Sequence, residues 1–273
     1  MRRLAAAALV FAAAFVALAF LLVPIVAIFA RVPPGRLVAQ LSNPVVTDAL
    51  VISLKTSAIA QALVLLLGTP AAYLLATRPF PGRALAITLA ELPLVLPPAV
   101  AGIGLIAAFG RFGLLGGTLS ALGIQLGLTQ AAVVVAVAFV ASPLYLRQAI
   151  ATFEAVDPDL VAASRTLGAG RGRTFFRVVL PLARNGLAAG EALAFARGLG
   201  EFGATIMFAG SLQGVTQTLP LAIYTEFAVN FDVTLAISAL LVLVSAALLV
   251  ALKVALQWQP SQRTSRFLFA PSS

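Results

Sequence analysis

The sequence predicts an all-α integral membrane protein with six membrane-spanning helices. Composition is the first reason: of 273 residues, 61% are hydrophobic and 10% are charged, whereas soluble domains are about 45–50% apolar and about 25% charged. Two further reasons are that the apolar residues form six long runs, and that basic residues gather on one side of these runs. Such a chain cannot cover itself with polar groups in water, so its solvent must be a bilayer.

The six apolar runs have the length of membrane-spanning helices, since a hydrocarbon core of about 30 Å needs about 20 residues per helix. The predicted spans are 4–30, 50–76, 84–109, 130–146, 187–209 and 233–256, all within one transmembrane domain of residues 1–256. Arg2 and Arg3 precede a first run that exceeds the 7–15 apolar residues or so of a signal peptide. We therefore interpret this run as an uncleaved helix, and residues 257–273 as a cytoplasmic tail.

Basic residues orient these spans. With the N-terminus inside, thirteen arginines and lysines fall in cytoplasmic segments or inner span ends, and three fall in outer loops. This distribution follows the positive-inside rule and places both termini in the cytoplasm. The thirteen are Arg2, Arg3, Arg78, Arg83, Arg147, Arg165, Arg171, Arg173, Arg177, Arg184, Lys253, Arg263 and Arg266; the three are Arg31, Arg36 and Arg111.

The residue types present exclude most enzyme chemistry. The chain has no cysteine and no histidine, which removes disulfides, thiolate sites and the commonest general base. The stretch 168–174 (GAGRGRT) has glycines and basic residues, but it lacks the lysine and the strand-to-helix context of a phosphate-binding loop. We expect no catalytic residue, metal site or cofactor in this chain, and no nucleic-acid partner, because the bilayer already accounts for its net charge of +9.

The basic stretch between the fourth and fifth spans predicts two short helices. Asp157 is an N-cap, Pro158 suits the first helical position, and Gly168 is a C-terminal stop. A second helix is expected from Thr174, with Leu180–Pro181 ending or kinking it. Positive-inside bias explains any single arginine here equally well, but two capped helices outside the membrane indicate a docking element for a soluble partner.

This stretch resembles the cytoplasmic "EAA" loop of ABC-importer permeases. Gly168 is followed after nine residues by Val178 and, one residue later, by Leu180–Pro181, which is the spacing of that loop. The resemblance implies a six-helix transmembrane permease fold with a cytoplasmic coupling-helix loop, about 152–184, that fits a cleft on an ATPase subunit. The docking residues it implies are Ala162, Ala163, Ser164, Gly168, Val178, Leu180 and Pro181.

The chain departs from the family pattern at the loop's glutamate. The Glu-Ala-Ala of the family falls on Ala162, Ala163 and Ser164, so the usual Glu is absent. Asp159 or Glu154 would replace it only if the helix were rotated.

Two other stretches resemble the molybdate branch of the oxyanion permeases. They are ELPLVLPPAVAGIGL from Glu91 and ARGLGEFGATIMFAGSLQGVTQTLPLAIY from Ala196. Sulfate/thiosulfate permeases are similar but have Gly-Glu-Tyr-Gly where this chain has Gly-Glu-Phe-Gly at 200–203. Molybdate uptake is therefore expected; tungstate, which nothing in the sequence distinguishes, or sulfate/thiosulfate is the alternative, and a stand-alone channel or secondary transporter is a remote one.

The resemblance also implies partners and a location. The permease would work as a homodimer in a prokaryotic inner membrane. It would bind two copies of an ATPase subunit, which carry the ATP and Mg, and a periplasmic or lipid-anchored oxyanion-binding protein.

Prolines and charges inside the spans suggest a pathway or gate. Pro97 and Pro98 remove backbone donors and would kink the third span. Arg197 and Glu201 lie four residues apart on one helical face, so they can pair. They are either a structural pair or part of an anion pathway, and both interpretations stay open.

Overall fold

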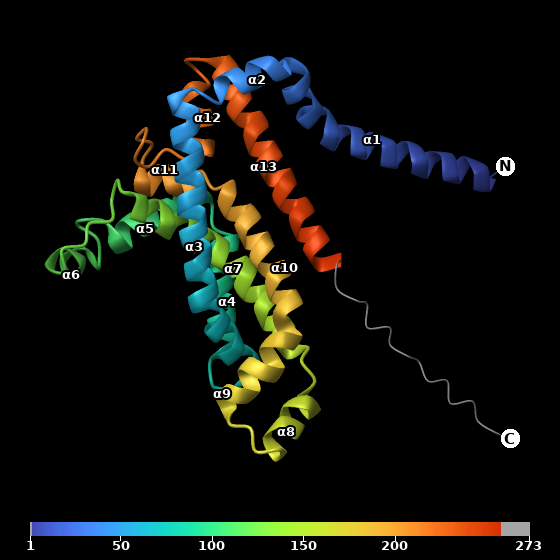
Figure 1. Cartoon of the computed structure of the whole chain (residues 1–273), viewed down its shortest axis with the longest axis vertical. Coiled ribbons are helices and arrows are strands. Elements are labelled where there is room, and N and C mark those ends of the chain that lie inside the picture. Colours follow the sequence, from blue (N-terminus) through green and yellow to red (C-terminus); the bar gives the residue numbers. More distant parts are fainter. Residues whose placement is uncertain (1, 258–273) are drawn as a thin grey trace.

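The computed structural model describes residues 2–257, and all regular secondary structure in that range is helical. Figure 1 shows long helices packed upright beside one another, with α1 leaving the bundle at an angle. The helices are α1 Arg2–Arg31, α2 Pro34–Gln40, α3 Pro44–Thr77, α4 Arg83–Glu91, η1 Leu92–Leu94, α5 Pro98–Phe109, α6 Gly116–Ala121, α7 Gln130–Glu154, α8 Pro158–Thr166, α9 Arg171–Thr174, η2 Phe175–Val179, α10 Leu180–Leu199, α11 Gly203–Ala209, α12 Leu219–Glu226 and α13 Phe231–Gln257.

Helix α7 is the centre of the bundle. Its N-terminal half packs against α5 and α11 through small apolar residues such as Ala132 and Ala136, both of which are fully buried. Its C-terminal half packs against α3 and α10 around Tyr145, which is also fully buried. Small side chains at helical spacing let the neighbouring helices approach closely.

Two glycines on α10 let this helix pack closely against α7. A Cβ atom at Gly186 would lie 2.1 Å from Oγ1 of Thr152, and one at Gly190 would lie 2.9 Å from Cβ of Gln148. No larger residue fits at either position without displacing α7. The spacing of these two glycines, four residues apart, is that of close helix pairs in membranes.

Each predicted span lies on a helix or a broken pair of helices, with different bounds. The fourth is longer than predicted, because α7 continues to Glu154. By length and composition, four described helices can cross a bilayer, and a fifth span results if a bent pair in the third span counts as one. The fifth predicted span differs from these because α10 carries three charged residues, Arg184, Glu191 and Arg197. The tail 258–273 lies outside the described residues.

The prediction that Leu180–Pro181 ends the second short helix is wrong, because the helix continues through both residues. The second short helix begins at Arg171 rather than Thr174, passes through the π-helical turn η2, and continues into α10. In the π turn the N–H of Leu180 donates to the carbonyl of Phe175, five residues back. This wider turn accommodates Pro181, since π turns inside helices re-register the hydrogen bonds.

Candidate functional site

The docking element predicted from the sequence is a short helix at one end of the molecule. Figure 1 shows α8 beyond the ends of α3 and α7, at the end opposite α2 and α12. The Asp157 side chain accepts a hydrogen bond of 2.9 Å from the N–H of Asp159 and so caps α8. Gly168 follows the helix with φ +82°, a conformation that favours glycine. The cap and the stop are both confirmed.

Four of the seven predicted docking residues line one groove. Ala163, Ser164, Val178 and Pro181 lie around a hollow of about 620 Å³ between α8 and the helix that follows it. Ser164 Oγ and Thr174 Oγ1 are 3.1 Å apart and join the two walls. The other three predicted residues, Ala162, Gly168 and Leu180, lie outside the lining of this groove.

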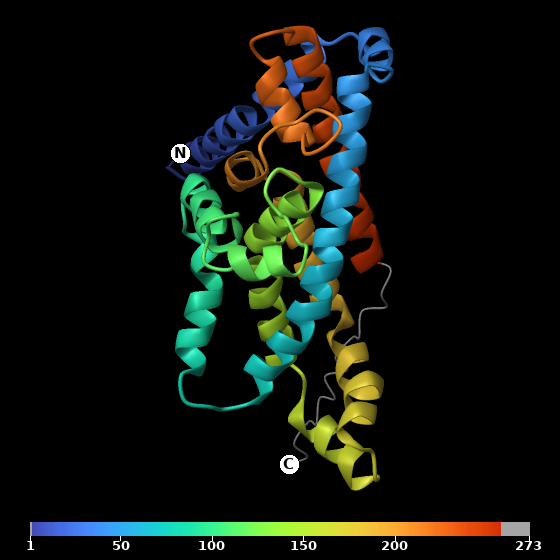
Figure 2. The ribbon, with the colours of Figure 1, turned by 90° about the vertical axis from the view of Figure 1, so that its left-hand side faces the viewer.

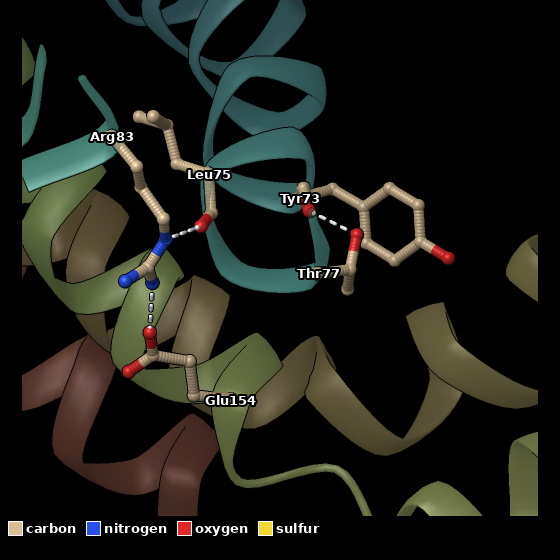
Figure 3. Close-up of polar contacts among 5 residues, drawn as sticks. All are labelled: Tyr73, Leu75, Thr77, Arg83 and Glu154. Atoms are coloured by element: carbon tan, nitrogen blue, oxygen red, sulfur yellow. Dashed lines mark hydrogen bonds and ion pairs between the residues drawn. The ribbon is translucent and has the colours of Figure 1, made fainter. Parts of the chain in front are cut away.

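Glu154 is not available to replace the missing glutamate of the loop. Its Oε1 accepts a hydrogen bond from Nη2 of Arg83, and Nε of the same arginine donates to the carbonyl of Leu75 (Figure 3). Arg83 therefore connects the start of α4 with the ends of α3 and α7.

A second ion pair also joins α4 to α7, but here α7 carries the arginine and α4 carries the glutamate. Nε of Arg147 on α7 lies 3.7 Å from Oε1 of Glu91 at the other end of α4. The two pairs join α4 to the C-terminal half of α7, and α7 leads directly into α8.

The third span is broken rather than kinked. Its two halves, Arg83–Leu94 and Pro98–Phe109, meet at an angle of 114°. Pro97 is the N-cap of α5 and Pro98 is its first residue. The prolines interrupt the third span as the sequence predicts, but the result is a break rather than the expected kink.

The fifth span is broken as well, and the two breaks meet. α10 ends at Leu199 and α11 begins at Gly203. A Cβ atom at Gly203 would lie 2.3 Å from Cβ of Pro98, so the starts of α5 and α11 touch. Irregular backbone at membrane depth is tolerated only where protein surrounds it or a water-filled cavity adjoins it.

Arg197 and Glu201 form an ion pair beside this junction. Nη1 of Arg197 lies 2.9 Å from Oε2 of Glu201. The other carboxylate oxygen accepts a hydrogen bond of 2.7 Å from the N–H of Ala204 at the start of α11. The Glu201 side chain is 1% exposed and that of Arg197 is 38% exposed. The structure therefore ties the Arg197–Glu201 pair to the start of α11, which touches Pro98, and both oxygens of the acid are occupied.

The sequence analysis missed a line of buried polar side chains on α3. Ser53, Ser57 and Gln61 are at most 4% exposed and lie on one face, four residues apart. Ser53 Oγ accepts from the N–H of Leu219, whereas the amide of Gln61, which faces Gly198, has no partner among the described residues. Their regular spacing within an apolar run was the signal that could have found them.

Metal ligands are not gathered anywhere in residues 2–257, where no group of three histidine, cysteine or acidic side chains could hold an ion. The arrangement is that of a helical membrane component with two broken helices and a protruding loop. Residues 65–259 match the family of binding-protein-dependent transport system inner membrane components. The chain belongs to this family and is a multi-pass membrane protein.

Three named relatives are 34–45% identical to this chain over their aligned parts. The chain is 45% identical to the molybdenum transport system permease protein ModB of Mycobacterium tuberculosis, over 87% of this chain and 90% of the relative. It is also 45% identical to ModB of Escherichia coli K12, over 65% of this chain and 78% of that one. With NifC of Clostridium pasteurianum, a probable transport system permease protein, it shares 34% identity over 87% of this chain and 83% of NifC.

Solved structures show the same fold at low identity. One is a chain of a bacterial ABC transporter involved in the import of the acidic polysaccharide alginate. The match covers 94% of this chain and 96% of that chain, with a TM-score of 0.73 and 15% identity. A chain of the MetNI methionine ABC transporter, in an inward-facing conformation, matches 78% and 95% with a TM-score of 0.59 and 21% identity. The fold is therefore that of an ABC transporter permease.

Proposed function

We propose that this chain is the membrane permease of an ATP-driven importer that takes up molybdate. The observation that carries the proposal is the capped helix α8, which ends at the left-handed Gly168 and protrudes beyond the spanning helices. A rigid element there is suited to docking on a soluble subunit. The 45% identity to proteins named as molybdenum transport permeases supports the substrate.

The assembly follows from the same proposal. Two copies of the permease form the pathway between them, each docked through its α8 loop on one ATPase subunit that holds ATP and Mg. A periplasmic or lipid-anchored binding protein delivers the oxyanion from outside. The α8 end and both termini are cytoplasmic, in the membrane of a prokaryotic cell.

The junction of the two broken spans is the proposed gate. Pro97 and Pro98 start α5 where Gly203 starts α11, and the Arg197–Glu201 pair lies next to them. Breaks of this kind in transporters lie next to substrate pathways. The ion pairs of α4 with α7 would transmit movement of the loop towards this junction.

Reconstitution tests the proposal directly. The permease, its ATPase subunit and the binding protein are placed in liposomes, and ATP hydrolysis and uptake are measured with molybdate, tungstate or sulfate on the binding protein. We expect molybdate to stimulate both activities more than sulfate does, and the unloaded binding protein to serve as the control. Preferential stimulation by sulfate would reassign the substrate, and uptake without the ATPase subunit would contradict an ATP-driven importer.

A further inference from the structure

A second hollow, on the other side of α8, lies at the inner ends of the spanning helices. It has a volume of about 570 Å³ and is lined by the end of α3, the end of α7, α8 and the start of α9. Phe153 and Val179 on its wall are buried, and Val156 and Val161 are half-buried. Part of this cavity is therefore apolar.

Three arginines from three different elements line the same cavity. Arg78 follows α3, Arg165 lies on α8, and Arg171 starts α9. Among the described residues, no carboxylate lies within 4.0 Å of any of these three guanidinium groups, since the ion pairs found there involve other arginines. The arginines thus leave positive charge around the cavity without a partner.

The one acidic residue in the lining does not offset this charge. That residue is Glu154, which pairs with Arg83 as Figure 3 shows. The acids nearest to α8 along the chain, Asp157 and Asp159, are not part of the lining. Tyr73 and Thr77 also line it, each with a hydroxyl group, and that of Thr77 already donates to the carbonyl of Tyr73. The cavity therefore combines an apolar wall with three arginines and the hydroxyl of Tyr73, all of which can donate to phosphate oxygens.

We propose that this cavity binds the headgroup of an anionic phospholipid, with phosphatidylglycerol as the representative. Arg78 directly follows the last residue of α3, so the cavity lies where a spanning helix leaves the bilayer. Basic pockets between helix ends at this level bind anionic headgroups. A free oxyanion shares the phosphate chemistry, but it offers nothing to the apolar wall, which suits the glycerol and first methylenes of a lipid.

A bound lipid would connect the loop to the spanning helices. The headgroup bridges Arg165 on α8 and Arg78 at the end of α3, so the position of α8 depends on the surrounding lipid. This inference goes beyond the proposed transport function and requires only that the chain spans a bilayer.

Lipid binding by the purified full-length chain tests the inference. Affinity is measured by native mass spectrometry in detergent with phosphatidylglycerol and, as the zwitterionic comparison, phosphatidylcholine. The triple variant Arg78→Gln, Arg165→Gln, Arg171→Gln is compared with Arg173→Gln, Arg177→Gln, Arg184→Gln, which removes the same charge from neighbouring positions outside the cavity lining. Each cavity arginine should contribute about fivefold, so the first variant should lose on the order of 100-fold in affinity and the second far less.

The outcomes separate lipid binding from its alternatives. Equal losses in the two triple variants would show that only net charge matters and would overturn the proposal. Displacement of the lipid by millimolar inorganic phosphate, with no preference for phosphatidylglycerol, would show a free-anion site and overturn the choice of lipid. The three single variants supply the same comparison if a triple variant fails to fold. Uptake is not part of the readout, so failure here is distinct from failure of the transport proposal.

Discussion

At the residue scale, Glu201 has the greatest structural consequence among the charged residues. It is the one charged residue in the described part of the chain that is buried. An isolated buried carboxylate is costly, and this one is offset by an arginine and by a backbone N–H. The pair is either a structural pair or part of an anion pathway. Variants of Arg197 and Glu201 should differ in stability and in uptake according to which of the two holds.

Removing Arg197 should destabilise the protein more than removing Glu201. Arg197→Ala leaves a buried carboxylate without its counter-ion, at a cost of about 3 kcal/mol, the low end for a buried pair because Arg197 is itself partly exposed. Glu201→Ala leaves an arginine that already reaches solvent, and the unpaired N–H of Ala204. The double variant should recover part of the loss. The measurement is thermal unfolding of the purified variants.

Transport of the double variant distinguishes the roles of the pair. Recovered stability together with recovered uptake indicates a structural pair, whereas recovered stability without uptake indicates a role in the pathway. If Arg197→Ala unfolds at the wild-type temperature, the pair is not structural.

At the element scale, the sequence predicted α8 more accurately than the broken spans, for a physical reason. A cap such as Asp157 and a stop such as Gly168 act within a few residues, so local rules suffice. The prolines of the third span predict a kink but not its 114° bend. The bent helix contacts Gly203 through Pro98, and local sequence rules do not describe a contact between residues so distant in sequence. The continuation of the helix through Pro181 depends likewise on a π turn that no local rule indicated.

Gly168 permits a prediction about the α8 loop with a matched control. A Cβ atom there meets nothing within 4 Å, so any penalty comes from the φ of +82° alone. Gly168→Val should distort the end of α8, because β-branched residues avoid this conformation, whereas Gly168→Asn should be tolerated. No spanning helix changes in either variant. We expect Gly168→Val to lose co-purification of the ATPase subunit and at least about tenfold in uptake, and Gly168→Asn to stay near wild type.

The same two variants can contradict the docking role. If Gly168→Val retains both ATPase binding and uptake, the left-handed stop is not needed for docking. If both variants lose binding equally, space rather than backbone conformation limits this position.

At the scale of the whole molecule, the two ends of the bundle differ in structure. One end holds α2, α12 and the start of α13, and the other holds α8 and α9 (Figure 2). The arginine-lined cavity lies at the α8 end. Positive charge at the α8 end agrees with the positive-inside rule. The orientation in the membrane is therefore proposed from charge, and a labelling experiment can test it.

The absence of cysteine from the chain makes that experiment simple, because a single introduced thiol has no background. Leu167, after α8, is 88% exposed, and Val229, in the turn between α12 and α13, is 82% exposed, so neither substitution disturbs a core. In intact spheroplasts that express the permease alone, a membrane-impermeant thiol reagent should label Val229→Cys and not Leu167→Cys. Permeabilised cells should label both, which shows that each thiol is reactive. Labelling of Leu167→Cys from outside would invert the topology, and with it place the docking loop on the side where no ATP is available.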